Sequence, residues 1–363
     1  MDDILIGTRK GLFRLLSGEL SLVGFLGVPV TNVMRDPRDG RIHAAVDHGH
    51  FGTKLHHSDD DGATWAEVDP PAYPPRPADA TDVDPVRGEP VDWTTKLLWS
   101  IEPAHPDDAG ALWCGTIPGG LFRSEDRGET WLLVRSLWDE PSRAKWFGGG
   151  YDHPGIHSVS VDPTDPDTLA VGVSCGGVWV THDRGKSWTA ATGMRAGFMP
   201  PEDAMRPEIQ DPHRVARCRD HPQSMWVQHH SGIFRSTDGG ATWSEITDVA
   251  PSNFGFAVAA HPSDPDTAWF VPAANDDQRV PIDGRMVVNR TRDGGATFES
   301  LSAGLPQSHG WHLVYRHGLD VDATGEQLVL GSTSGGLWTS DDGGDHFNLV
   351  SNDLPPIAAV RFV

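Results

Sequence analysis

The sequence predicts an all-β protein: a single seven-bladed β-propeller of four-stranded blades that spans residues 1–363. Three observations predict this fold. A short turn motif recurs six times, the same series of short strands surrounds each copy, and the two ends of the chain each hold part of one further unit. A repeat of roughly 50 residues is typical of propellers and solenoids.

The turn motif reads Ser/Thr-x-Asp-x-Gly-x-Ser/Thr-aromatic and occupies residues 58–65, 124–131, 181–188 and 236–243, with looser copies at 291–298 and 340–347. Its aspartates are 66, 57, 55, 55 and 49 residues apart. Asp and Ser/Thr side chains accept hydrogen bonds from backbone amides in tight turns, and Gly adopts positive φ. The aromatic residue begins the next strand and packs between sheets. We therefore interpret the aspartates as structural.

The copy around residues 156–190 shows the four-strand unit clearly. Alternating apolar residues predict strands at 156–161 and 168–173, and a third strand covers 177–181. Asp162 and Pro163 mark the first turn, and Trp188 begins the fourth strand after the repeated motif.

The two ends of the chain complete each other. Residues 4–26 supply a second, third and fourth strand without a first, whereas residues 357–362 resemble a first strand with nothing after it. We expect the C-terminal strand to join the N-terminal blade, which closes the ring of seven and leaves only short sheet edges.

Composition narrows the range of partners. The net charge of −22 argues against nucleic-acid and anionic-membrane surfaces, which require clustered Lys and Arg. The N-terminus has no basic segment followed by a long apolar run, and three cysteines cannot all pair within the chain. These features predict a cytoplasmic protein with no nucleic-acid partner, no membrane span and no disulfide framework.

The repeated motif over residues 58–347 resembles the Asp-box, or bacterial neuraminidase repeat, propellers. That superfamily includes sialidases, xyloglucan-active glycosidases, sortilin-type receptors and photosystem assembly factors, so the resemblance implies the fold and leaves the function open. The sequence is similar to bacterial proteins labelled glycosyl hydrolase or exo-alpha-sialidase. It departs from the sialidase pattern, because the first blade lacks Arg-x-Pro. Of the three tyrosines, Tyr73 lies in a Pro-rich stretch, and Tyr151 and Tyr315 lack a recognisable Glu context. True sialidase activity is therefore not expected.

Propellers usually bind ligands at one mouth of the central channel, and the repeat predicts which residues lie there. His105, His221 and His261 fill a turn position that Asp occupies in other units, and we interpret them as turn residues. Ten of the 18 histidines fall at mouth positions. Metal-ligand candidates there are His48, His50, His157, His309 and His317. Ligand-binding candidates are His213, Arg214, His229, His230, Tyr315, Arg316 and Lys96.

Converging imidazoles suit acid/base chemistry or a divalent metal, although none of these spacings is a tight metal motif. The alternative is that these histidines are structural and bond backbone carbonyls. Whether a cofactor is bound therefore stays open.

Four insertions, at residues 69–96, 136–155, 191–212 and 273–285, are expected to rise over the mouth as lids. The second and third insertions flank the unit that carries His153 and His157, so these two histidines are catalytic candidates, together with His312. The acid/base candidates are these three histidines and the carboxylates Asp152, Glu208 and Asp211.

Two functions fit these patterns. The first is an enzyme of hydrolase or lyase type that acts on a small polar molecule or glycan at the channel mouth, with Arg214 or Arg316 orienting an anionic group. The second is a non-catalytic module that binds a protein partner through its rim. The second function requires an exposed apolar rim around Trp138, Trp146, Phe147 and Met199.

Overall fold

The computed structural model describes residues 3–149 and 151–363. Its strands form seven four-stranded sheets, which confirms the predicted seven-bladed β-propeller fold. The chain forms two compact units. Unit 1 contains residues 1–33, 213–239 and 244–363, and unit 2 contains residues 34–212 and 240–243. Two of the boundaries between the units fall inside strands, β4 (Val30–Arg35) and β16 (Pro212–Arg217).

Unit 1 is built on four sheets. The first combines both ends of the chain in the order β28-β1-β2-β3, with β28 (Ile357–Phe362), β1 (Asp3–Thr8), β2 (Gly11–Leu16) and β3 (Glu19–Gly24). The second continues from β16 with β17 (Met225–His229), β18 (Gly232–Ser236) and β19 (Ser244–Ile246). The third contains β20 (Gly255–Ala260), β21 (Ala268–Pro272), β22 (Val288–Thr291) and β23 (Glu299–Leu301). The fourth contains β24 (Leu319–Val321), β25 (Leu328–Gly331), β26 (Leu337–Ser340) and β27 (Asn348–Ser351).

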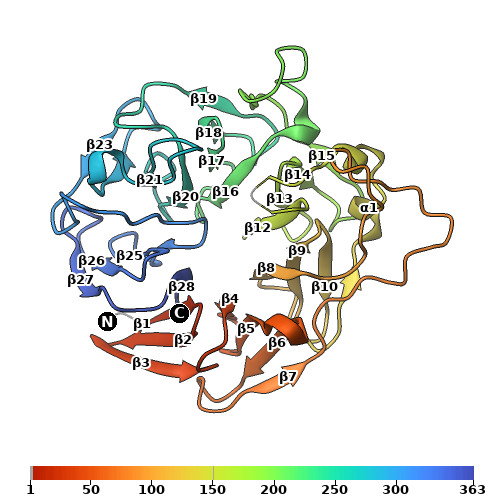
Figure 1. The fold of residues 1–363 in the computed structure, drawn as a ribbon, viewed down its shortest axis with the longest axis horizontal. Helices are drawn as coiled ribbons and strands as arrows, with labels where there is room; N and C mark the ends of the chain where they lie inside the picture. The colour runs from red at the N-terminus through yellow and green to blue at the C-terminus, as the bar shows by residue number, and fades with distance from the viewer. Residues whose placement is uncertain (1–2, 150) are drawn as a thin grey trace. The chain divides into compact units, whose positions relative to one another are not determined.

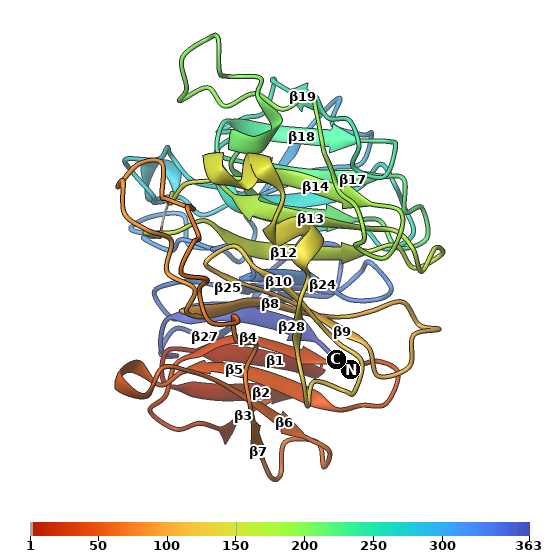
Figure 2. The same ribbon diagram turned by 90° about the vertical axis from the view of Figure 1, so that its right-hand side faces the viewer.

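Unit 2 is built on three sheets. The first continues from β4 with β5 (Ile42–Asp47), β6 (Thr53–Ser58) and β7 (Ala66–Val68). The second contains β8 (Leu97–Pro103), β9 (Leu112–Ile117), β10 (Leu121–Ser124) and β11 (Leu132–Leu133). The third contains β12 (Gly155–Val161), β13 (Leu169–Ser174), β14 (Gly177–Thr181) and β15 (Thr189–Ala190), and Figure 2 shows β12, β13 and β14 side by side.

Short helices interrupt the loops: α1 (Arg135–Trp138), η1 (Gly49–Phe51), η2 (Pro141–Lys145), η3 (Pro207–Ile209) and η4 (Ile282–Gly284). Among the described residues, no helix has the length and apolar character needed to cross a membrane.

The pairing of β28 with β1 confirms the predicted joining of the chain ends. The two strands run antiparallel, with Ile6 opposite Val360, and Figure 1 shows β28 (dark blue) beside β1 (red). Ile357 and Val360 are buried against Ile6 and Val329 in the hydrophobic core of this part of unit 1. The last strand therefore contributes both backbone hydrogen bonds and apolar packing.

The repeated turn motif is held by its own side chains. In the first copy, Ser58 Oγ accepts a hydrogen bond from Gly62 N (2.8 Å), and Asp60 Oδ1 accepts one from Thr64 N (2.8 Å). Gly62 has a φ of 88°, the left-handed conformation that the motif predicts. Hydrogen bonds to the Asp60 carboxylate from Thr64 and Ser58 lower its pKa. The side chains of Ser58 and Asp60 therefore accept hydrogen bonds from backbone N–H groups of the turn.

The histidines of the Asp/His-Pro turns also have local partners, as predicted. His105 Nδ1 accepts a hydrogen bond from Asp107 N (3.2 Å), and His261 Nδ1 accepts one from Asp264 N (2.9 Å). These contacts reproduce what an Asp side chain does at the same position, where Asp162 Oδ1 accepts from Thr164 N (2.9 Å).

Candidate functional site

In unit 2, two of the long insertions pack against each other and form a charged surface with an exposed aromatic ring. We call Arg87, Asp92, Lys96, Tyr151, Asp152 and His153 the Tyr151 cluster. Arg87 of insertion 69–96 is ion-paired with Asp152 of insertion 136–155, and Lys96 Nζ lies 2.9 Å from Asp92 Oδ2. Gly150 of the second insertion lies outside the described residues.

Tyr151 is the aromatic part of this cluster. Its ring is 50% exposed and packs edge-to-face on Trp99, with centroids 5.1 Å apart. Trp99 is buried and also contacts His157, with ring centroids 5.4 Å apart. Trp99 therefore supports the phenol ring, while about half of Tyr151 stays exposed to solvent.

Electrostatics keep the carboxylates of the Tyr151 cluster ionised. A hydrogen bond from Arg87 lowers the pKa of Asp152, and one from Lys96 lowers the pKa of Asp92. Burial and the positive charges of Lys96 and Arg87 lower the pKa of His153, so its imidazole is neutral near pH 7. The cluster thus presents carboxylates and ammonium and guanidinium groups together.

The remaining acid/base candidates have structural partners. His157 is fully buried, with Nδ1 2.8 Å from Ser158 Oγ and Nε2 2.7 Å from the carbonyl oxygen of Pro212. Glu208 lies 2.5 Å from Lys145 Nζ, and this hydrogen bond lowers the pKa of Glu208 against the opposing effect of its burial. Both arrangements fit residues that fix the backbone or an insertion in place.

In unit 1, a second group of predicted residues surrounds Phe256 in β20. The imidazole of His213 in β16 stacks on its ring with centroids 4.4 Å apart, and the guanidinium of Arg316 lies 5.6 Å from the ring centre. Tyr315 packs edge-to-face on the same ring at 5.0 Å. Arg279, from insertion 273–285, lies 5.6 Å from the centre of the Phe256 ring. Four predicted or insertion residues thus share one aromatic neighbour.

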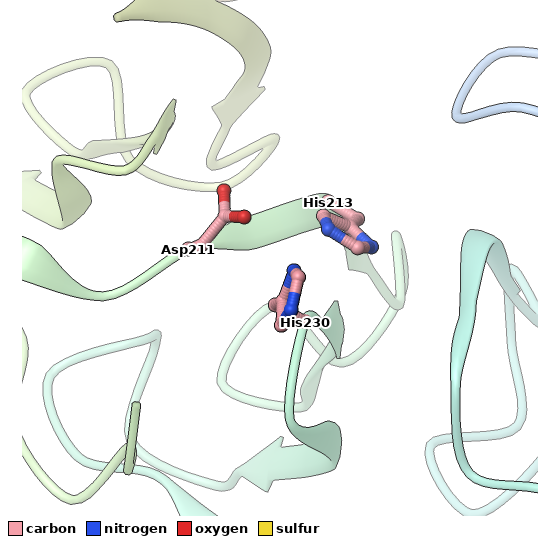
Figure 3. A group of neighbouring side chains, drawn as sticks. All are labelled: Asp211, His213 and His230. Atoms are coloured by element: carbon pink, nitrogen blue, oxygen red, sulfur yellow. The ribbon is translucent and has the colours of Figure 1, made fainter. Parts of the chain in front are cut away.

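His213 also belongs to a compact group of potential metal ligands. Among residues 3–149 and 151–363, the structure brings one group of three or more such side chains together: Asp211, His213 and His230. One ligand atom from each lies within 4.8 Å of the other two. Figure 3 shows a ring nitrogen of His230 pointing toward the space between Asp211 and His213. We call these three residues the His213 triad.

One sheet positions the whole triad. Asp211 directly precedes β16, His213 is the second residue of that strand, and His230 lies in the turn between β17 and β18. The boundary between the units passes between Pro212 and His213, but a single residue separates Asp211 from His213 along the chain.

Neighbouring groups fix each member of the triad. His213 Nδ1 is 2.6 Å from the carbonyl oxygen of Gly255, and Asp211 Oδ1 accepts hydrogen bonds from Cys175 N (3.0 Å) and Ser174 Oγ (3.2 Å). His230 Nε2 lies 3.7 Å from Asp276 Oδ2. Asp211 and His213 are buried, with exposed fractions of 4% and 3%.

The other predicted histidines lie apart from the triad. His48, directly before η1, and His50, within η1, are exposed and contact Phe51, and His309 is exposed with a φ of 53°. His317 is buried and forms a parallel bridge to Ala359, with its carbonyl oxygen accepting from Val360 N (2.8 Å). The five residues predicted as metal ligands are not among the three that the structure brings together.

His312, His229 and Arg214 complete the predicted set. His312 Nδ1 lies 2.7 Å from Ser334 Oγ and 3.1 Å from Ser332 Oγ, and burial lowers its pKa. His229 is fully buried and accepts a hydrogen bond at Nδ1 from Ser231 N (3.0 Å). Arg214 is half-buried in β16, directly after His213.

Sequence reasoning did not identify Asp320, whose carboxyl group has an unusual environment in β24. Burial raises its pKa, although the positive charges of Arg361 and Arg214 act in the opposite direction. Asp320 Oδ2 accepts a hydrogen bond from Phe362 N (2.9 Å). The available signal was a carboxylate between Leu319 and Val321 in a short apolar strand.

Comparison with known proteins supports the repeat and the fold. The BNR/Asp-box repeat model matches residues 234–245. An oligoxyloglucan-reducing end-specific xyloglucanase of Emericella nidulans is 28% identical over 264 residues, which is 66% of this chain and 28% of the relative. A xyloglucanase of a Paenibacillus species is 25% identical over 267 residues, 63% of this chain and 24% of the relative.

A solved structure covers nearly the whole chain. The GH74 xyloglucanase from Xanthomonas campestris superposes with a TM-score of 0.65 at 18% identity, over 99% of this chain and 52% of that protein. The chain therefore spans about half of this structure and less than a third of the two curated relatives. These relatives are xyloglucanases, whereas the sequence alone indicated only a sialidase-like superfamily. The protein is an Asp-box repeat propeller that is similar to part of these enzymes.

Proposed function

We propose that this protein is a glycan-processing hydrolase that binds an oligosaccharide of the glucan class. The observation that carries the proposal is its similarity to xyloglucanases over about two thirds of its sequence. The superposition of 99% of this chain on about half of a xyloglucanase structure supports a shared propeller fold. The expected ligand is thus an uncharged polysaccharide fragment. The net negative charge of the protein neither attracts nor repels such a ligand.

The Tyr151 cluster is the surface that we assign to the sugar. Sugars present C–H faces that pack on aromatic rings and hydroxyl groups that hydrogen-bond to charged side chains. Tyr151 offers an open ring supported by Trp99, and Arg87, Lys96 and Asp152 supply polar groups around it. This combination suits a neutral oligosaccharide.

Glycosidic bond hydrolysis generally uses two carboxyl groups, one to protonate the leaving oxygen and one to activate water or attack the sugar. Asp152 fits the second role, because Arg87 lowers its pKa and keeps it ionised near pH 7. His153, adjacent in the chain and neutral at that pH, can relay to solvent the proton that Asp152 takes from the attacking water, and the leaving sugar oxygen takes its proton from solvent water. We assign Asp152 as the base or nucleophile of the proposed reaction.

The test is hydrolysis of xyloglucan oligosaccharides and other glucans, followed as release of reducing ends. Asp152→Asn should lower kcat by at least about 100-fold, as expected for loss of an acid/base group. Tyr151→Ala should raise KM by about 10-fold with a smaller effect on kcat, because it removes a binding contact. Glu125→Gln is the matched control, since Glu125 is also exposed and ion-paired with an arginine, Arg123.

Two results would reject this proposal. One is the absence of hydrolysis and of binding with every glucan tested, and the other is a control variant as impaired as Asp152→Asn. Of the four residues that the protein-binding alternative places at an exposed rim, Trp138 and Trp146 are each 2% exposed, which weighs against that alternative. Their expected exposure is wrong because both rings pack into the hydrophobic clusters of unit 2.

A further inference from the structure

We propose that Asp211, His213 and His230 bind a divalent transition metal ion of the zinc class. This assignment is independent of glycan hydrolysis and concerns a different part of the chain from the Tyr151 cluster. It starts from the convergence of three ligand atoms within 4.8 Å of one another (Figure 3). Two imidazoles and a carboxylate at such separations can share one ion after small side-chain adjustments, because Zn–N and Zn–O bonds are about 2.0–2.2 Å.

The chemistry of the donors selects the class of ion. Imidazole nitrogens favour Zn²⁺, Fe²⁺ and Cu²⁺, whereas Ca²⁺ and Mg²⁺ prefer sites made only of oxygen. Two histidines and one carboxylate form the protein ligand set of several catalytic zinc sites, where the remaining position takes water or substrate. Three protein ligands would therefore leave at least one position of the ion open.

The surroundings of His213 fix the nitrogen that can bind. Its Nδ1 lies 2.6 Å from the carbonyl oxygen of Gly255, so Nδ1 carries the proton and donates it there. Nε2 then holds the lone pair and can coordinate a metal. A ligand histidine that donates its other N–H to a backbone carbonyl is the usual outer arrangement of a metal site. Stacking on Phe256 at 4.4 Å further restricts rotation of the ring.

The other two ligands are oriented in a similar manner. Two hydrogen bonds, from Cys175 N and Ser174 Oγ, hold Oδ1 of Asp211. His230 Nε2 faces the Asp276 carboxylate at 3.7 Å, which leaves Nδ1 available to the metal and places a carboxylate beside the ring. Ring contacts with Phe254, at 5.7 Å from His230 and 5.8 Å from His213, supply an apolar wall. Low polarity around the donors strengthens metal binding.

The experiment measures metal binding by the whole protein. Chelator-treated protein is titrated with Zn²⁺ in a calorimeter, and Co²⁺ is added separately to record its visible absorption. We expect one ion per chain, a higher melting temperature with Zn²⁺, and a Co²⁺ spectrum from a site with nitrogen and oxygen ligands. His230→Ala should lower Zn²⁺ affinity at least about 100-fold, since loss of outer-shell partners alone costs 10–100-fold.

Controls separate ligand loss from misfolding. His230 is half-buried in a turn and is the variant with the least risk to folding, whereas Asp211→Asn keeps the shape of a buried side chain. His50→Ala removes an exposed histidine outside the triad and should bind Zn²⁺ as the unmodified protein does. Circular dichroism of each variant without metal shows whether it is folded. Stoichiometry below one ion per chain, or equal affinity of folded His230→Ala and the unmodified protein, would overturn the assignment.

Discussion

The imidazole of His213 lies nearly parallel to the phenyl ring of Phe256, with centroids 4.4 Å apart and an interplanar angle of 13°. Together with the contact to the Gly255 carbonyl oxygen, this stacking restricts the ring of His213 to one plane. Preorganised ligands bind a metal more tightly, because less rotational freedom is lost on binding. Phe256 therefore acts as a positioning residue for the His213 triad.

Replacing Phe256 tests that role. Phe256→Leu keeps an apolar side chain but removes the flat surface under His213, and Zn²⁺ affinity should fall by about 10-fold. Calorimetric titration with Zn²⁺ provides the measurement. Phe234→Leu is the matched control, since Phe234 contacts His229, the neighbour of His230, with ring centroids 5.2 Å apart. An equal loss in both variants would assign the effect to general loosening of unit 1.

A buried histidine in unit 2 should make stability depend on pH. Burial, with help from the positive charge of Arg41, lowers the pKa of His43 to about 4, whereas an unfolded chain has a value near 6.5. As the pH falls through 6.5, the unfolded state gains a proton first, so the free energy of unfolding decreases until about pH 4. The full effect is about 3 kcal/mol for this single group.

The matching variant is His43→Gln, which fills similar space without titrating in this range. Urea unfolding at pH 7, 5 and 4 should show a shallower loss of stability for the variant than for the unmodified protein. Asp59, whose hydrogen bond from Arg41 lowers its pKa to about 2, loses its contribution to stability below about pH 5, but it does so in both proteins and therefore leaves their difference unchanged. Parallel pH curves for the two proteins would contradict the assignment to His43.

The repeated motif made the fold predictable, because its turns use side chains of the motif itself. Asp60 and Ser58 accept hydrogen bonds from groups four residues away, so local sequence is sufficient to specify the turn. The closing strand was predictable for a different reason. The first unit lacks one strand, and the C-terminal end of the chain has one strand without a sheet, so the two were expected to pair. Pairing of Ile6 with Val360 confirms that inference.

The site was less predictable, because side-chain direction depends on distant backbone. His157 occupies the slot that the repeat indicated, yet both of its ring nitrogens meet protein groups, one of them the Pro212 carbonyl oxygen 55 residues along the chain. Trp138 was expected at an exposed rim, but Tyr73 and Trp93 pack on it as the insertions fold back. The alternation of apolar and polar residues within one strand cannot predict contacts with segments that are distant in the sequence.

The closing strand should contribute strongly to stability. Ile357 in β28 is 3% exposed and packs in the apolar cluster shared with β1 and β25. Ile357→Ala removes buried carbon atoms and leaves a cavity, so the free energy of unfolding should fall by about 2–4 kcal/mol. Chemical denaturation gives this value. Leu349→Ala, at a position in β27 that is 51% exposed, should change stability by no more than about 0.5 kcal/mol.

Two glycines with nearly the same backbone conformation allow steric contact to be separated from backbone strain. Gly304 has a φ of 81° and Gly18 a φ of 83°, so alanine at either position costs about 1–2 kcal/mol for the left-handed conformation. A Cβ at Gly304 would lie 1.7 Å from the carbonyl oxygen of Phe347, whereas a Cβ at Gly18 meets nothing within 4 Å. The chain at Gly304 must therefore move.

Gly304→Ala should consequently lower the free energy of unfolding by clearly more than Gly18→Ala, by roughly 2 kcal/mol or more beyond the shared strain. Moving residue 304 also disturbs the hydrogen bond from Phe347 N to the carbonyl oxygen of Ala303 (2.9 Å), which anchors the last copy of the repeated motif. Urea unfolding of both variants gives the comparison. Equal losses would mean that the backbone around Phe347 yields easily, and that this close approach does not stabilise the fourth sheet of unit 1.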